Sequence, residues 1–262
     1  MQLSAWRFYL SAPILLLAVT TAQATDFAPS DSSSSAPIVT PVPAPMTRPG
    51  AVSLVAWGGA SFSDNFYGGY IGAVKALNGD LWNEGLLFRI DGAAGSYRYR
   101  SSILGYSYYV HTKSADVMIG YRAHVGTGWL TGYVGPSFQD NDNKDPTARI
   151  RGTKWGVKGI AEYNVPLSDR FQASAFGTYA TEYSTYFVMG RLGYNVNVAQ
   201  DVWLGPEASL FGTRDYEDRR VGAFINIGTA RGAIGISGGY LDARHSNDDG
   251  YYLNLNVSFA FN

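Results

Sequence analysis

One short stretch of the sequence has the spacing of a catalytic nucleophile. Gly235-Ile-Ser237-Gly-Gly239 fits the pattern G-x-S-x-G, in which the serine sits on a sharp turn between a strand and a helix. Such a serine also needs a histidine and an acid beside it, and the chain offers His111, His124 and His245. Here the pattern lies inside a glycine-rich segment of strand type, where small residues pack in a sheet. We therefore expect a protein without catalytic residues.

An acidic stretch resembles the start of a calcium-binding loop. Asp140-Asn-Asp142-Asn-Lys144-Asp145 places oxygen-bearing side chains at alternate positions. However, Lys144 occupies a ligand position, Asp145 replaces the turn glycine, and Arg151 replaces the closing glutamate. The sequence has no cysteine, which excludes thiolate metal sites and disulfides. It predicts neither a metal site nor a cofactor.

The remaining candidates are charged residues that share one face of the predicted strands. Side chains alternate across a strand with a period of two. In a membrane barrel, a charge on the lipid face costs about 2–4 kcal/mol near the midplane, so the charged face must be the lumen. The same rule also places Lys75 and His124 inside. The predicted polar residues that line the lumen are Arg89, Asp91, Asp116, Arg122, Lys154, Lys158, Glu162, Arg191, Glu207 and Arg220.

Two interpretations of these charges stay open. They could pair across strands and fill a narrow barrel, since buried charges need partners. Alternatively, their excess of cations could line a polar passage or a sugar-binding surface, with tyrosines such as Tyr97, Tyr99, Tyr108 and Tyr109 near the outer rim as stacking faces.

The elements that position these residues are strands. No sustained 3.6-residue period with helix caps is present. Alternating segments recur instead, bounded by Gly, Asn, Asp or Pro. Twelve strands are predicted, an even number as in bacterial barrels. They lie near Ala51–Phe62, Tyr67–Leu77, Gly85–Tyr97, Thr112–Val125, Gly128–Phe138, Gly152–Asn164, Arg170–Ala180, Thr185–Asn197, Asp201–Phe211, Arg219–Gly228, Gly232–Leu241 and Gly250–Asn262.

The final segment, Tyr251–Asn262, shows the alternation most clearly. Its odd-numbered residues are apolar and its even-numbered residues are small or polar, except Tyr252. About ten residues suffice for a tilted strand to cross the hydrocarbon layer. A soluble sandwich or lipocalin-like barrel is the rival explanation, because alternation alone does not distinguish the two.

The N-terminal region predicts export. Arg7, the apolar run Ile14–Val19 and Ala22-Gln-Ala24 have the order of a secretory signal peptide, which we assign to residues 1–24. Residues 25–50 are rich in proline and serine and are predicted to form a disordered tether. Residues 51–262 would then form the barrel. A net charge of −1 gives no footprint for nucleic acid.

The sequence thus predicts an all-β protein, a transmembrane antiparallel up-and-down β-barrel in the bacterial outer membrane, in contact with lipid and lipopolysaccharide. If the last strand runs toward the periplasm, the outer connections should be the longer ones. The predicted outer connections include Arg98–His111, Gln139–Arg151, Gly212–Asp218 and Asp242–Asp249.

Five stretches in order resemble the cellulose biosynthesis protein BcsS family, and the resemblance covers Leu54–Asn262. They begin at Leu77-Asn-Gly-Asp-Leu81, Ser114-Ala-Asp116, Gln139-Asp140, Tyr186 with Arg191-Leu-Gly193-Tyr194, and Gly205-Pro-Glu207-Ala208. The resemblance implies an outer-membrane protein associated with bacterial cellulose production. It brings no catalytic residues.

Three functions follow from these observations. The leading hypothesis is a non-enzymatic barrel, accessory to the cellulose synthase system, that contacts synthase subunits or the nascent glucan. The alternative is a narrow porin-like channel for small anions or oligosaccharides. The third is an outer-membrane lipid-modifying enzyme with His124 as its base.

Overall fold

The computed structural model describes residues 51–101, 103–213, 216–229, 231–244 and 249–262. The predicted signal peptide and tether lie outside these residues. Within them, no helix is long and apolar enough to cross a membrane.

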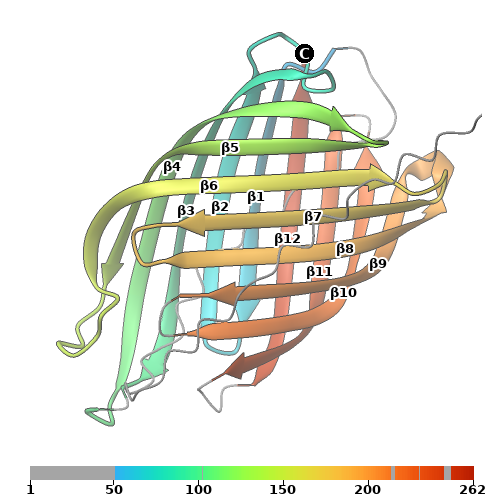
Figure 1. Cartoon of the computed structure of the whole chain (residues 1–262). Helices are drawn as coiled ribbons and strands as arrows, with labels where there is room; N and C mark the ends of the chain where they lie inside the picture. The colour runs from blue at the N-terminus through green and yellow to red at the C-terminus, as the bar shows by residue number, and fades with distance from the viewer. Residues whose placement is uncertain (1–50, 102, 214–215, 230, 245–248) are drawn as a thin grey trace, which may run out of the picture.

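Twelve antiparallel strands close into one barrel, which confirms the predicted fold (Figure 1). Each strand pairs with its neighbours along the chain, and β12 pairs with β1 from Leu54 opposite Phe261 to Ser63 opposite Tyr252. A short 3-10 turn, η1 (Val198–Gln200), precedes β9. The strands are β1 (Leu54–Ser63), β2 (Phe66–Ala76), β3 (Gly85–Arg100), β4 (Ser107–Val125), β5 (Gly128–Asp142), β6 (Gly152–Pro166), β7 (Phe171–Ala180), β8 (Thr185–Asn197), β9 (Val202–Gly212), β10 (Glu217–Thr229), β11 (Gly232–Arg244) and β12 (Gly250–Phe261).

We call the end of the barrel that holds Leu54 and Phe261 the inner end, and the opposite end the outer end. The outer connections are shorter than the sequence predicted, because the strands themselves continue outward. β3 extends to Arg100 and β4 begins at Ser107, which leaves only residues 101–106 between them. The connection between β5 and β6 is likewise reduced to residues 143–151.

The closing strand β12 shows how alternation builds the wall. Leu253 and Leu255 are exposed on the outside, whereas Asn254 and Asn256 are buried on the inside. Across the closing seam, Ser61 Oγ donates a hydrogen bond of 2.6 Å to Asn254 Oδ1. The inward polar residues thus fix the pairing of the first and last strands.

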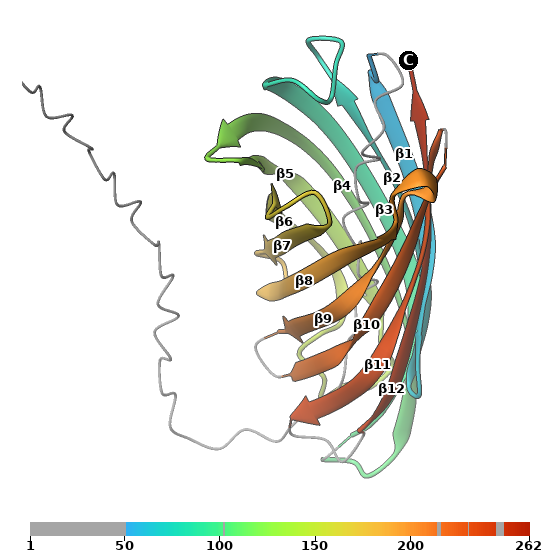
Figure 2. The ribbon, with the colours of Figure 1, turned by 90° about the vertical axis from the view of Figure 1, so that its right-hand side faces the viewer.

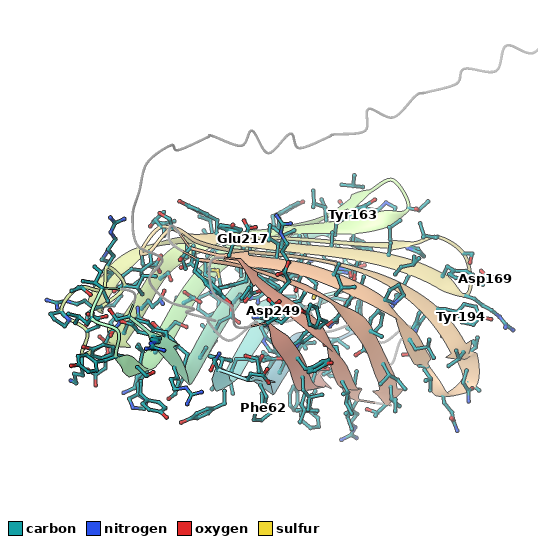
Figure 3. All side chains as sticks on the ribbon, turned by 90° about the horizontal axis from the view of Figure 1, so that it is seen from below. Phe62, Tyr163, Asp169, Tyr194, Glu217 and Asp249 are labelled. Carbon is teal, nitrogen blue, oxygen red and sulfur yellow. The ribbon has the colours of Figure 1, made fainter. Side chains whose placement is uncertain are left out.

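The exterior of the barrel is apolar around its circumference. Large side chains stay exposed on successive strands, as a lipid-facing wall requires and a soluble protein avoids. They include Ile71, Ile90, Val117, Ile119, Val134, Val157, Val188, Leu192, Val221, Ile225, Ile234 and Ile236. At the inner end the exposed aromatics Phe171, Phe259 and Phe261 add to this surface, and Figure 3 shows Tyr163, Asp169 and Tyr194 at the same end.

Lys75 corrects one prediction. It is exposed on the outer face of β2, while its neighbours Val74 and Ala76 pack inside. It lies near the inner end, paired with Leu54 and Phe88. A long lysine stem can cover apolar surface there while the ammonium group reaches water.

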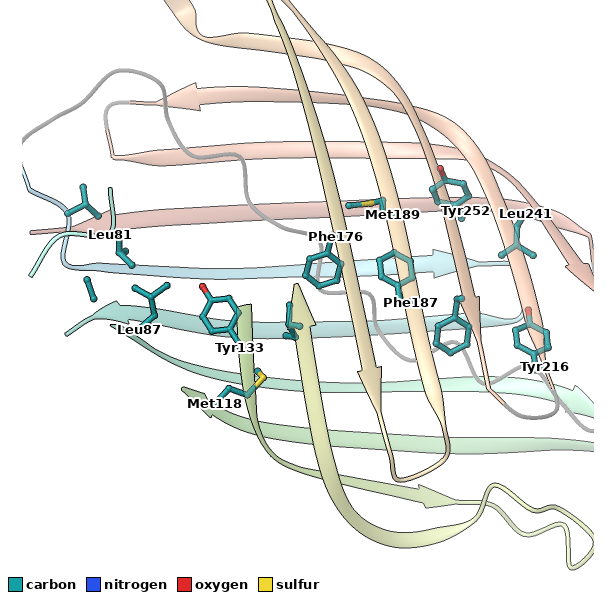
Figure 4. Close-up of a cluster of buried hydrophobic side chains, with 14 of the residues drawn as sticks. Leu81, Leu87, Met118, Tyr133, Phe176, Phe187, Met189, Tyr216, Leu241 and Tyr252 are labelled. Atoms are coloured by element: carbon teal, nitrogen blue, oxygen red, sulfur yellow. The ribbon is translucent and has the colours of Figure 1, made fainter. Parts of the chain in front are cut away.

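The interior is less polar than expected. Buried apolar side chains from β2 to β9, β11 and β12 meet between the walls, together with residues of the connections (Figure 4). In Figure 1, β6, β7 and β8 run across in front of β1, β2 and β12, and Figure 2 gives the side view. The members of this central cluster include Leu87, Met118, Tyr133, Ile160, Phe176, Phe187, Met189, Phe211 and Tyr252.

Candidate functional site

A cavity of about 330 Å³ occupies the inner half of the lumen, and we call it the inner cavity. It lies at the inner end, because its lining includes residues from the start of β1, from the end of β12 and from the inner turns. Its lining combines aromatic rings with hydrogen-bonding groups. The lining residues that bear on function are Trp57, Trp82, Trp129, Tyr133, Phe224, Arg89, Arg122, Glu162, Asn164, Gln172 and Asn226.

The tryptophans reach the cavity from three separate elements. Trp57 projects inward from β1, Trp129 from the start of β5, and Trp82 from the connection between β2 and β3. Trp57 depends on a glycine across the strand pair, because a Cβ at Gly72 would come within 2.5 Å of the indole ring. Backbone pairing of Trp57 with Gly72 thus creates the space that the ring fills.

Arg122 lies between two of these rings. Its guanidinium carbon is 4.9 Å from the ring centre of Trp129 and 5.7 Å from that of Trp82, both within cation–π range. Its Nη1 donates to the carbonyl oxygen of Leu81 at 2.8 Å. Its Nε has no hydrogen-bond partner among the described residues. The guanidinium group of Arg122 is therefore held in a fixed position in the wall of the cavity.

Arg89 closes the cavity on the side of the barrel centre. It forms ion pairs of 2.7 Å with Asp91 and 2.6 Å with Glu162. Its guanidinium carbon also lies 4.9 Å from the ring centre of Trp57 and 5.1 Å from that of Tyr133. Beyond it lies a smaller cavity of about 70 Å³, the outer cavity, which Asp91 lines while Glu162 lines the inner one. Arg89 and its two carboxylates thus form a partition between the cavities.

Other buried charges inside the lumen pair between adjacent or nearby strands. Lys158 Nζ lies 2.5 Å from Asp116, which also accepts a hydrogen bond from the Ser137 hydroxyl. Arg191 lies 2.6 Å from Glu207, and the Tyr252 hydroxyl donates to the same carboxylate at 2.8 Å. Such pairing offsets part of the cost of removing charges from water.

The structure brings seven of the ten predicted lumen residues into ion pairs with one another. These are Arg89, Asp91, Asp116, Lys158, Glu162, Arg191 and Glu207.

The other three differ from this pattern. Arg220 pairs at 2.8 Å with Asp218, a residue that the sequence placed in an outer connection and not in the lumen. Lys154 is exposed, with its Nζ 4.3 Å from the ring centre of Tyr183. Arg122 has the two indoles described above rather than a carboxylate.

Sequence reasoning missed the tryptophans of the cavity. The inward alternation of Trp57 and Trp129 could have identified them, since both share a face with predicted lumen residues or their paired neighbours. No strand pattern could have identified Trp82, which lies in a connection. Of the proposed sugar-stacking tyrosines, Tyr97 and Tyr99 are buried, and Tyr109 is exposed.

The structure also shows the residues that the sequence analysis considered for catalysis and metal binding. Gly235–Gly239 lies within β11, and buried Ser237 accepts a hydrogen bond from Asn254, so no nucleophile turn forms there. His124 packs its ring 4.9 Å from that of Trp129. Among the described residues, no group of three or more His, Asp or Glu side chains could hold a metal ion.

Comparison with known proteins gives the family and the fold. The family model "Cellulose biosynthesis protein BcsS" matches residues 55–261. An outer membrane channel from Pseudomonas putida F1 is similar at 14% identity and a TM-score of 0.52, over 86% of this chain and 100% of that one. The beta domain of the Bordetella autotransporter BrkA is similar at 12% identity and a TM-score of 0.50, over 81% of this chain and 100% of that one. No curated protein matches the sequence.

At these identities the two structures show the barrel fold alone. The family model, in contrast, matches the barrel from its first strand to its last. The chain belongs to the cellulose biosynthesis protein BcsS family.

Proposed function

We propose that this protein is an outer-membrane accessory of the cellulose synthase system that binds a segment of glucan in its inner cavity. The observation that carries the proposal is the set of inward indoles, Trp57, Trp82 and Trp129, in one cavity with the guanidinium group of Arg122. The flat apolar faces of sugar rings stack on aromatic side chains, while their hydroxyl groups need a few well-placed polar partners.

The size and charge of the cavity fit such a ligand. Ligand pockets span about 300–1,000 Å³, so a cavity of 330 Å³ suits a short segment of about one or two sugar rings. Glu162, Asn164 and Asn226 add acceptors and amide donors to its wall. A neutral glucan needs this mixture rather than a charged lining of one sign.

Orientation follows from the predicted export. With a signal peptide at residues 1–24 and a tether at 25–50, the inner end of the barrel faces the periplasm, and the apolar wall contacts lipid and lipopolysaccharide. The inner cavity is then accessible to glucan or to periplasmic synthase subunits. Its role is binding without bond cleavage, because glycosidic bonds are ordinarily hydrolysed by two carboxylates, whereas the described lining residues include Glu162 alone, which is ion-paired with Arg89.

Titration of the purified barrel with cello-oligosaccharides tests this proposal, with binding followed by intrinsic tryptophan fluorescence and calorimetry. We expect Trp129→Ala to weaken binding at least about tenfold, since base- and ring-stacking contacts contribute on the order of 1–3 kcal/mol. Trp155→Ala is the matched control, because Trp155 is 74% exposed on the outer wall. Absence of saturable binding to the wild type, or equal losses in both variants, would contradict the proposal.

The porin alternative receives less support. The partition at Arg89 and the central cluster occupy the lumen between the two cavities. Recordings of the purified protein in planar bilayers test the difference, and a glucan-binding barrel of this kind should give no conductance steps. Steady single-channel conductance of the wild type would favour the porin function instead.

A further inference from the structure

A groove of about 890 Å³ lies on the outside of the barrel, near the outer end of β2 to β5. Alternation places Ser96, His111 and Asp142 on the outer face, because their chain neighbours Tyr97, Thr112 and Asn141 point inward. His111 and Asp142 are exposed, whereas Ser96 is only 7% exposed at the base of the groove. Phe62, at the outer end of β1, also borders the groove and points away from the wall (Figure 3). None of the outward polar residues takes part in the lumen network.

Three of these residues form a row across three strands. Ser96 on β3 lies opposite His111 on β4, and His111 lies opposite Asp142 on β5. The Ser96 hydroxyl oxygen is 2.6 Å from Nδ1 of His111. A serine hydrogen-bonded to a histidine is the pair of nucleophile and base that activates a serine, and the strand register brings the Asp142 carboxylate next to that histidine.

The remainder of the groove suits an amphipathic substrate. Gly69 and Ala94 have little or no side chain, which leaves the wall hollow beside Ser96. Lys113 and Arg151 place cations on the same groove. Toward the middle of the barrel, the same outer faces carry exposed Ile71, Ile90 and Val117. The row therefore lies where an apolar wall meets a polar rim.

We propose that this groove is a second, catalytic site that hydrolyses acyl esters of membrane glycerophospholipids. Acyl chains would lie along the apolar wall, and Lys113 and Arg151 would hold the headgroup phosphate. The site is independent of glucan binding, which uses the opposite face of the barrel wall. It also differs from the enzyme considered in the sequence analysis, whose base was His124.

The reaction consumes one water and releases a fatty acid. Ser96 Oγ attacks the ester carbonyl carbon while its proton passes to His111 Nδ1. The bond from this carbon to the glycerol oxygen then breaks, and His111 returns the proton to that oxygen, so the lysolipid leaves. Water attacks the acyl-serine, again giving a proton to His111, and this proton returns to Ser96 Oγ as the fatty acid departs.

Nearby charged side chains assist the reaction without forming or breaking covalent bonds themselves. The negative charge of Asp142 stabilises the imidazolium that forms at His111, which makes it a positioning residue. It also lies 2.7 Å from Lys144 in an exposed ion pair. Lys113 or Arg151 can stabilise the charge that develops on the carbonyl oxygen.

The test uses the folded full-length barrel in detergent micelles. Fatty-acid release from diacylphosphatidylethanolamine and labelling by a fluorophosphonate probe are measured for the wild type, Ser96→Ala and His111→Ala. We expect labelling at Ser96, and at least a hundredfold loss of turnover in both variants. Ser107→Ala is the matched control, since Ser107 is an exposed serine on the same strand as His111. Heat-dependent gel migration verifies that each variant is folded.

Three outcomes would overturn the proposal: no labelling of the wild type, no fatty-acid release, or equal turnover in wild type and Ser96→Ala. Asp142→Asn should lower kcat with little change in KM, whereas a merely structural role would change stability alone. Cello-oligosaccharide affinity is measured on the same wild-type preparation as fatty-acid release, so failure of glucan binding and failure of this proposal are distinguishable.

Discussion

Replacement of Arg89 by methionine gives the sharpest test of how the lumen is held together. The guanidinium group neutralises both Asp91 and Glu162, and the Arg89 side chain is only 4% exposed. Methionine keeps much of the apolar stem but leaves two carboxylates without their cation. Breaking a buried pair in this way costs about 3–5 kcal/mol. Because Arg89 serves two carboxylates, we expect a loss near the upper end of that range.

The assay is equilibrium unfolding of the barrel in detergent micelles with urea, followed by tryptophan fluorescence. Trp57, whose ring centre is 4.9 Å from the Arg89 guanidinium carbon, makes this signal sensitive to the site. Removal of the carboxylates together with the cation should restore most of the lost stability, because no uncompensated charge remains. We therefore compare R89M with the triple variant R89M/D91N/E162Q.

A loss below about 1 kcal/mol in R89M would refute this reasoning, because it would mean that the two carboxylates are already solvated or neutral. Equal losses in R89M and the triple variant would refute it differently, by assigning the effect to packing against Trp57 rather than to charge. Arg219→Met is the control, since Arg219 forms an exposed ion pair with Glu217.

Three further predictions address other parts of the chain. Burial alone would raise the pKa of Asp145 in the β5–β6 connection, but hydrogen bonds from Thr147 lower it. The contribution of this carboxylate to stability should therefore be present at neutral pH and lost as the pH falls below about 3.9. Denaturation of the wild type and Asp145→Asn at neutral and at acid pH would reveal a stability difference that disappears in acid. Glu182 is buried and neither of its oxygens has a partner among the described residues. Glu182→Met removes these unpaired acceptors with little change in shape and should raise the free energy of unfolding by about 1–3 kcal/mol, and a decrease would show an unrecognised partner. Gly72→Ala should displace the indole of Trp57 and weaken cello-oligosaccharide binding severalfold in calorimetry, while unchanged affinity would exclude that ring from the site.

The fold was predictable because alternation on a strand is a local property. Thr185–Asn197 was predicted with the same bounds as β8, since Val188 and Leu192 on one face and Arg191 and Asn195 on the other already define the wall. For such a strand, closing the sheet into a barrel requires only that it pairs with a neighbouring strand on each side. The ends were less predictable, because β3 continues outward where the outward residues are no longer apolar: exposed Arg98 and Arg100 alternate there with buried Tyr97 and Tyr99.

The site was only half predictable, for a physical reason. Alternation identifies the face on which Arg89 and Glu162 lie, but these residues are on β3 and β6, and no local pattern gives the distance across a lumen. The choice of partner depends on that distance. Asp218 escaped notice because it was predicted to end a connection, whereas it is the second residue of β10, two residues before its partner Arg220.

The partition also bears on which of the considered functions the barrel can serve. An open passage would require Arg89 to release Asp91 on one side and Glu162 on the other, and both ion pairs are 2.7 Å or shorter. Since truncating one such pair is already costly, thermal opening of both at once would be rare. A ligand that enters the inner cavity would therefore leave by the same end. Capture or anchoring of glucan at the periplasmic side agrees with that geometry, whereas conduction across the membrane would require a second conformation of Arg89.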